Sequence, residues 1–255
     1  MIPTFIVSKD RPLYIASYLE SLRGQPLKKT VFFKVSSIEM KVHYQMVAKE
    51  FPEVEWIDEN QFGGLAKTLG GWLEKNNDLC MVSVDDNICL RPISEDAVRT
   101  AMEDKECFGF SLRLSEKAHG HNPMITRVKE GVYSYFPKQY EKKTNWAYVF
   151  EVSSTVYRPE TILAALALTK GNTVNKLEIA GYNKYMGTVE KMACFMKAPL
   201  VNIYVDSHRH KNFEVFLSEA DALKLYLEGK RFDPEKYRQY RDDTGNNHIG
   251  EIFLK

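Results

Sequence analysis

The chain has 255 residues, of which 44% are hydrophobic and 27% are charged, and its net charge is +1. This length allows a full hydrophobic core, and the balanced charge excludes bulk attraction to nucleic acid or to an anionic membrane. The sequence also excludes a membrane-spanning segment, a disulfide framework and a cysteine zinc site, because no apolar run is long enough and no Cys-x-x-Cys pair occurs.

The first third of the chain alternates between strand and helix patterns. Apolar runs predict strands at residues 2–7, 30–35, 54–57 and 79–84. Helical spacing of apolar residues predicts helices between these strands, the last of them beginning near Leu65. Four strands joined by three helical crossovers predict an α/β fold with a mostly parallel central sheet. We expect one domain over residues 1–255, with a ligand-binding half at 1–92 and a second half at 93–255.

Polar turns follow each of the four predicted strands and should meet at one edge of the sheet, where ligands bind in such folds. Lys9 and Arg11 can contact a phosphate or a base. Gly63 and Gly64 precede a helix, so their amides can approach a ligand closely. Lys67 can reach a phosphate from the next turn, or it can belong to a solvated face. The four turns are Ser8–Arg11, Ser36–Ser37, Asp58–Glu59 and Asp85–Asn87.

Asp85, Asp86 and Asn87 close the strand at residues 79–84. Two neighbouring carboxylates repel each other, and a divalent cation is a common way to make such a pair tolerable. Oxygen ligands favour Mg²⁺ or Mn²⁺. The alternative is a simple turn, because Asp and Asn both suit turns and caps.

The second half of the chain offers fewer clear signals. Strands are expected at residues 107–114, 145–158 and 198–205, and helices at 94–103, 159–168, 179–186 and 231–243. His119 and His121 can ligate a metal, but without a third nearby ligand a loop is the better interpretation. We expect Asp10 to cap the first helix and Pro12 to lie in its first turn.

The first strand with Ser8–Pro12, the helix start at Gly63–Lys67, and Val84–Asn87, in this order, resemble a GT-A-fold glycosyltransferase of the family-2-like bacterial type. The resemblance covers residues 1–92 and implies a three-layer GT-A sandwich that binds a nucleotide-sugar. The sequence departs from the common Asp-x-Asp motif by ending in Asn87, and Ser36–Ser37 replaces the usual acidic uridine contact. The implied contacts to the nucleotide-sugar are Ser8, Lys9, Arg11, Ser37, Gly63, Gly64, Lys67 and Asp85.

The resemblance also implies roles for residues that hold a metal, bind the acceptor or catalyse transfer. The implied metal ligands are Asp85, Asp86 and Asn87, and His248 or His208 can complete the shell. Trp146 and Tyr148 are expected to line the acceptor cleft, although core packing would also explain them. The catalytic candidates are Asp86 and Glu178, the latter as general base, with Glu151 and Glu160 as rivals and a helix-start carboxylate as the structural alternative.

The function implied is metal-dependent transfer of a sugar from a nucleoside-diphosphate donor to a hydroxyl of a saccharide or glycolipid, in bacterial surface-polysaccharide or glycoconjugate synthesis. The expected location is cytoplasmic, with peripheral membrane association left open. A nucleotidyltransferase is the alternative enzyme, but the turn Ser8–Pro12 lacks the glycine-rich character that it should have. A GT-A-like domain that binds glycans or partners without catalysis is the non-enzymatic alternative, and it would be indifferent to metal.

Overall fold

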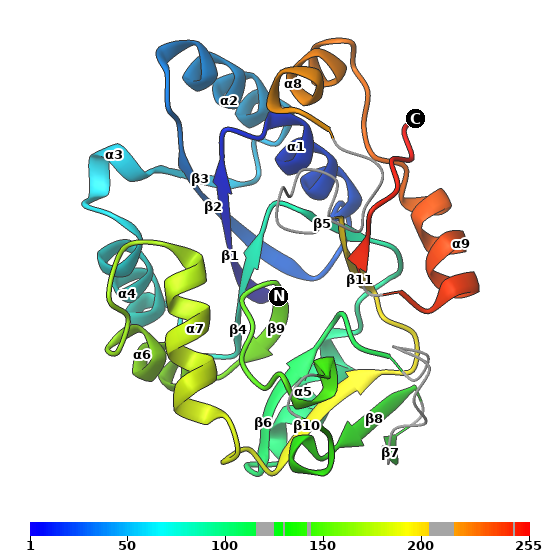
Figure 1. Cartoon of the computed structure of the whole chain (residues 1–255). Helices are drawn as coiled ribbons and strands as arrows, with labels where there is room; N and C mark the ends of the chain where they lie inside the picture. Colours follow the sequence, from blue (N-terminus) through cyan, green and yellow to red (C-terminus); the bar gives the residue numbers. More distant parts are fainter. Residues whose placement is uncertain (116–124, 130, 142–143, 204–216, 247) are drawn as a thin grey trace.

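The structure is a computed structural model that describes all residues except 116–124, 130, 142–143, 204–216 and 247. Within the described residues, nine strands form a large central sheet (Figure 1). In order across the sheet these are β3 (Glu55–Asp58), β2 (Leu27–Lys34), β1 (Ile2–Lys9), β4 (Cys80–Val84), β9 (Ser154–Tyr157), β6 (Cys107–Ser111), β10 (Lys191–Phe195), β8 (Val132–Tyr135) and β7 (Ile125–Lys129).

Most strands of the central sheet share one direction. β1 is parallel to β2 and β4, β2 is parallel to β3, and β6 is parallel to β10. β9 runs antiparallel to both β4 and β6, and β8 runs antiparallel to β10 and β7. The mostly parallel central sheet predicted from the sequence is therefore confirmed, with β9 and β8 as the two reversed strands.

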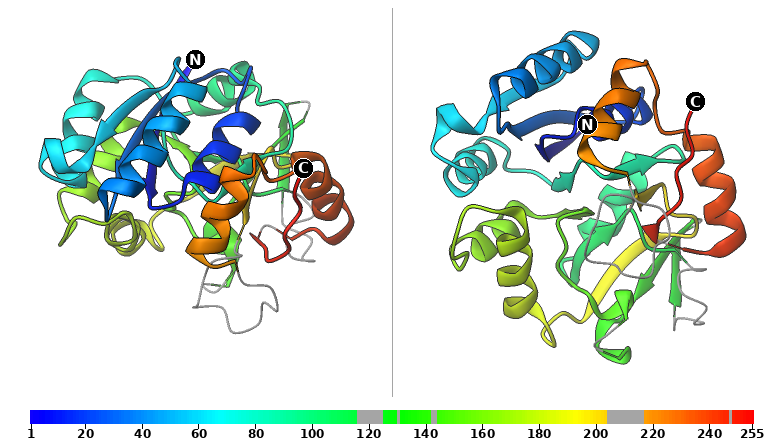
Figure 2. Two further views of the ribbon diagram at one scale, coloured as in Figure 1. Left: turned by 90° about the horizontal axis from the view of Figure 1, so that it is seen from above. Right: turned by 45° about the horizontal axis from the view of Figure 1, so that its top comes forward.

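Helices cover both faces of the sheet and make three layers (Figure 2). Alternation along β1 explains how one strand serves two cores: Ile2 and Ile6 pack with the helices of one face, and Phe5 packs with those of the other. The first face carries α1 (Pro12–Ser21), α2 (Ile38–Glu50), α5 (Glu95–Glu103) and α8 (Glu219–Leu227), and the second carries α4 (Leu65–Lys75), α6 (Pro159–Leu166) and α7 (Val174–Tyr185).

A second, three-stranded sheet joins distant parts of the chain. It consists of β5 (Asn87–Cys89), β11 (Leu200–Ile203) and β12 (His248–Ile249). Asn202 pairs with Asn87 on one side and with His248 on the other. The sequence did not predict this sheet. It brings the acidic turn after β4 beside the C-terminal part of the chain.

Residues 145–158 differ from their expected strand structure. Only β9 is extended, and residues 145–147 form the short 3-10 helix η3 (Asn145–Ala147). Trp146, Val149, Phe150 and Val152 are all buried in irregular backbone, so their apolar character reflects burial and not strand formation. The helix expected at 179–186 begins earlier, at Val174, where the Thr173 hydroxyl caps it.

Smaller elements complete the described fold, and all four cysteines are buried and unpaired, in agreement with the sequence. Within the described ranges, every helix is too short or too polar to cross a bilayer. The remaining elements are α3 (Glu59–Phe62), η2 (Pro137–Gln139) and α9 (Pro234–Thr244).

Candidate active site

The turn between β4 and β5 begins with Asp85, directly beyond the carboxyl end of β4 and beside the last residues of β1. The Asp85 amide donates to the Val7 carbonyl at 3.2 Å, and its carboxylate accepts the Ser8 hydroxyl at 2.6 Å. The other carboxylate oxygen lies 3.1 Å from the Arg11 guanidinium. Asp85 is only 3% exposed, and a buried carboxylate needs such partners. The first and last of the predicted polar turns therefore meet at one edge of the sheet.

Tyr44 of α2 supports this contact, although no motif in the sequence had singled it out. Its hydroxyl lies 2.5 Å from the Ser8 hydroxyl and accepts the Arg11 amide at 3.1 Å. Burial and the negative charge of Asp85 raise the pKa of Tyr44. Because Ser8 gives its only hydroxyl proton to Asp85, the neutral Tyr44 hydroxyl donates to Ser8.

Asp10 does not cap α1 as predicted. Its backbone is left-handed, with φ 55°, and its carboxylate accepts the Ser36 amide at 2.8 Å. The N-cap residue of α1 is Arg11, and its side chain makes no capping hydrogen bond. Asp10 instead ties the turn after β1 to the turn after β2.

Asp86 and Asn87 face different surroundings. Asp86 is half-buried, and one of its carboxylate oxygens accepts the Asn202 amide at 3.2 Å. Asn87 is fully buried. Its amide group donates to Ser83 and to two backbone carbonyls, and its carbonyl oxygen accepts from Asn202 at 2.5 Å. Both ends of the Asn87 side chain are therefore used inside the protein, so it holds the turn in place and is not positioned as a metal ligand.

Arg113, in the segment after β6, connects the acidic turn to the other half of the site. Its guanidinium donates to Oδ1 of the Asn202 side chain at 2.6 Å and to Nε2 of His248 at 2.9 Å. It also forms an ion pair with Glu151. The same guanidinium nitrogen lies 3.3 Å from Nδ1, so the tautomer of His248 determines which ring nitrogen accepts this hydrogen bond. His248 is thus hydrogen-bonded to the positively charged Arg113 guanidinium, which does not support its expected role as a metal ligand. His119, His121 and His208 lie outside the described residues.

Glu151 is one of the two alternative candidates for the general base, and its side chain is held by contacts within the protein. Its side chain is 5% exposed and pairs with Arg113. It also accepts the Thr155 hydroxyl at 2.7 Å, and its backbone amide donates to the Tyr157 hydroxyl at 2.9 Å. These contacts leave Glu151 as a fixed buried negative charge beside Glu178.

Glu178 is half-buried on the inner side of α7, close to this fixed charge. Burial, and then the negative charge of Glu151, raise the pKa of Glu178 to about 7, while Arg113 and a hydrogen bond with Tyr148 oppose the shift. Tyr148 is half-buried, and its ring stacks on Tyr182 with centroids 4.6 Å apart. Burial, followed by the charge of Glu178, raises the pKa of Tyr148, which therefore stays a neutral donor. A carboxylate that titrates near neutral pH suits general base catalysis.

Two sequence candidates lie elsewhere. Glu160 lines a hollow together with Asp78, which precedes β4, so it lies at the edge of the sheet opposite to Asp85. Trp146 is fully buried between Tyr135 and Tyr140, with ring centroids 4.9 and 5.7 Å away. The structure therefore excludes Glu160 from this site and makes Trp146 a core residue, not part of an open acceptor cleft.

The remaining candidates on the predicted donor side occupy the same edge. Gly63 and Gly64 have φ of 79° and 93°, and a Cβ on Gly64 would lie 2.7 Å from the Asn172 side chain. Only glycine fits such a turn. Gly63 is exposed, and Gly64 is buried beside the Asn172 side chain. Ser37 caps α2 by accepting the Met40 amide at 3.0 Å, and the side chains of Lys9 and Lys67 are exposed.

The Arg113–Glu151 pair leads to a stability prediction. Arg113→Met should destabilise the protein by about 3–5 kcal/mol, because it leaves the Glu151 charge buried without its partner. Urea denaturation near neutral pH would measure this loss. The double variant Arg113→Met/Glu151→Leu should recover most of it. If the single variant is as stable as the wild type, Glu151 is not held as a buried charge.

Comparisons with known proteins give weak and partial similarities, and no family model matches the chain. The chain is similar to the bifunctional glycosyltransferase pgtA of Dictyostelium discoideum, with 23% identity over 262 residues, 88% of this chain and 34% of that protein. It therefore spans about a third of the length of the curated relative it matches.

Similar solved structures were also found, all at low structural similarity. The mannosyltransferase PcManGT from Pyrobaculum calidifontis, in complex with GDP-Man and Mn²⁺, has a TM-score of 0.38 and 14% identity, over 63% of this chain and 45% of that one. The bifunctional glycosyltransferase WbbM has a TM-score of 0.41 and 12% identity, over 74% and 38%. A 4-diphosphocytidyl-2C-methyl-D-erythritol synthase has a TM-score of 0.40 and 13% identity, over 72% and 84%.

Proposed function

We propose that this chain is a glycosyltransferase that moves a sugar from a nucleoside-diphosphate donor to an acceptor hydroxyl. One observation carries the proposal: a carboxylate that titrates near neutral pH, Glu178, lies beside the Glu151–Arg113 pair, and Asn202 links Arg113 to Asp86. A proton acceptor and an acidic turn thus share one polar network at the ligand-binding edge of the sheet. The similarity to a curated glycosyltransferase supports the same function.

The donor would bind where the turns after β1, β3 and β4 meet. Arg11 is one-third exposed and can contact a phosphate while it pairs with Asp85. The Gly63–Gly64 turn opens α4, whose first amides can bind the diphosphate. Lys9, Ser37 and Lys67 are the further donor contacts that we propose. Ser8 is 2% exposed and its hydroxyl is used by Asp85 and Tyr44, so Ser8 positions the turn instead.

A divalent cation is compatible with the acidic turn, but the residues that the structure describes do not by themselves complete its shell. Among the described residues, no group of three or more histidine, cysteine or acidic side chains gathers in one place. Mg²⁺ and Mn²⁺ sites often use one or two carboxylates together with substrate phosphates. We propose that Asp86, next to Asp85, holds such a cation, which when bound would neutralise charge on the leaving diphosphate.

On the acceptor side, Glu178 would take the proton from the attacking hydroxyl. Tyr148 holds the Glu178 carboxylate by a hydrogen bond, and its half-buried ring offers a face for a sugar. The acceptor class that we propose is a saccharide or glycolipid, as the resemblance to bacterial surface-polysaccharide enzymes implies.

The first test is thermal stabilisation by donors. A UDP-, GDP- or CDP-sugar at about 100 times its Kd should stabilise the chain by about 2.7 kcal/mol, which raises the melting temperature by about 5–10 °C. The shift should require Mn²⁺ or Mg²⁺. No shift with any of these donors, with or without metal, would contradict the proposal. Release of pyrophosphate from a nucleoside triphosphate and a sugar phosphate would indicate a nucleotidyltransferase instead.

A further inference from the structure

The outer surface of α6 and α7 combines exposed apolar side chains with lysines. Leu168 is 53% exposed and Ile179 is 52% exposed, and Leu163 and Met186 are also exposed. Of the ten large apolar side chains that are exposed in the described part of the chain, these four fall within residues 163–186. Leu168 and Ile179 line the same hollow. Isolated exposed apolar residues are normal, whereas neighbouring ones indicate an interaction surface.

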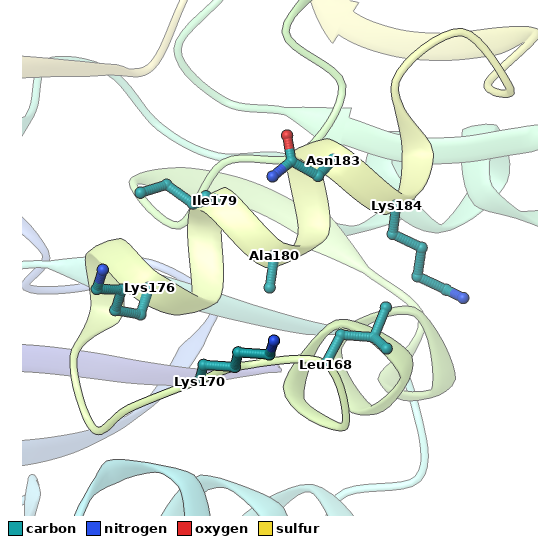
Figure 3. A pocket seen from close by; sticks show the side chains of 7 residues that line it. All are labelled: Leu168, Lys170, Lys176, Ile179, Ala180, Asn183 and Lys184. Atoms are coloured by element: carbon teal, nitrogen blue, oxygen red, sulfur yellow. The ribbon is translucent and has the colours of Figure 1, made fainter.

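A shallow hollow of about 440 Å³ lies within this surface, between α7 and the segment that connects it to α6 (Figure 3). Leu168 and Lys170 approach it from the connecting segment, opposite Ala180 of α7. Lys176 and Lys184 lie toward the two ends of α7 beside it. The hollow therefore has an apolar floor and a basic margin.

The charge of this surface differs from that of the whole chain. α6, α7 and their connection, residues 159–188, contain three lysines, Lys170, Lys176 and Lys184, and two acidic residues, Glu160 and Glu178. Glu160 lines a different hollow, together with Asp78. At about 100° of rotation per residue, Glu178 lies on the opposite side of α7 from Lys176 and Ala180. Within the described residues, none of the three lysines forms an ion pair with an acidic side chain. Their charges are thus available to an external anion.

We propose that the outer surface of α6 and α7 docks on an anionic lipid membrane. Long lysine side chains can place their ammonium groups among lipid phosphates while their methylene stems stay near apolar chains. Leu168 and Ile179 can enter the boundary between headgroups and acyl chains beside them. An acidic protein partner would also suit the lysines, but the exposed apolar side chains between them favour a surface that is anionic and apolar at once.

Vesicle sedimentation tests the proposal directly. The 255-residue chain should bind vesicles of equal parts phosphatidylcholine and phosphatidylglycerol, bind less as sodium chloride is added, and bind vesicles of phosphatidylcholine alone much more weakly. Each lysine-to-glutamine change on this surface should weaken binding about fivefold, and the triple variant Lys170→Gln/Lys176→Gln/Lys184→Gln about a hundredfold. Leu168→Gln/Ile179→Gln should weaken the binding that remains at high salt.

Matched controls separate this surface from general effects of charge and exposure. Lys105→Gln/Lys230→Gln/Lys236→Gln removes three exposed lysines elsewhere, and Ile38→Gln/Val42→Gln removes two exposed apolar residues on α2. Both control variants should bind the vesicles as the wild type does. The proposal is overturned if the wild type does not prefer anionic vesicles, if the α6–α7 variants bind normally, or if the chain binds polyglutamate but no vesicle, which would indicate an acidic protein partner. Donor binding is measured separately, so either result leaves the proposed glycosyl transfer to its own test.

Discussion

Glu178→Gln should slow sugar transfer strongly and, at the same time, make the protein more stable at about pH 8. A general base commonly contributes about 10²–10⁴-fold to the rate, so transfer should fall by that factor. Glutamine keeps the size of the side chain and a partner for Tyr148, so the fold and donor binding should persist. The measurements are initial rates of transfer and a thermal melt of the same sample.

The sign of the stability effect follows from the pKa of Glu178. The folded protein keeps this proton up to about pH 7, whereas the ordinary value is 4.5. Stability from this group is therefore fully present below about pH 4.5 and is lost as the pH rises through about 7. Glutamine cannot ionise, so the variant should gain about 1–3 kcal/mol at about pH 8.

The same pKa determines the pH dependence of catalysis. Transfer by the wild type should rise with pH through about 7, because the base works in its deprotonated form. Glu160→Gln, at the opposite edge of the sheet, is the matched control and should change neither rate nor pH profile. If the Glu178→Gln variant has wild-type activity, Glu178 is not the general base. If its melting temperature at high pH equals that of the wild type, the pKa of Glu178 is not raised in the folded protein.

Asp86→Ala should abolish metal-dependent nucleotide binding without unfolding the protein. Asp86 is half-buried at an edge, so its removal opens no core cavity and relieves repulsion with Asp85. Loss of a cation ligand should make the Mn²⁺-dependent part of the thermal shift disappear. Titration of the variant with a nucleotide-sugar, with and without Mn²⁺, measures this directly.

The competing view is that the acidic residues only shape the turn. In that case Asp86→Ala would lower stability by about 1 kcal/mol and leave nucleotide affinity intact. Asp243→Ala, an exposed aspartate on α9, is the control for loss of one negative charge. Asp86→Ala with unchanged affinity would remove the proposed metal site and much of the case for glycosyl transfer.

The sequence could predict the elements whose signals are local. Within residues 2–84, the spacing of apolar residues in each segment predicts that segment's strand or helix. The polar turns lie between these predicted elements at one edge of the sheet, so the contact of Ser8 and Arg11 with Asp85 could be anticipated. The pairing of Asn87 with Asn202 could not, because the two strands are short and lie more than 100 residues apart. Nothing in either segment alone specifies its partner.

Arg113 and Asn202 were missed for a different reason. Each is a single polar residue within a short apolar segment, Leu112–Leu114 and Leu200–Ile203, and such residues are costly to bury without a partner. That signal was available in the sequence and marks a buried network. It does not identify the network's other members, which come from β12 and from the segment before β9.

The three-stranded sheet has a consequence for how the protein is made. The acidic turn is translated within the first third of the chain, but Asn202 and His248, which complete its surroundings, are translated much later. Domains generally begin to fold as the N-terminal part leaves the ribosome. Strands β1 to β4 can therefore form early, whereas the surroundings of the acidic turn are complete only after Asn202 and His248 have been translated.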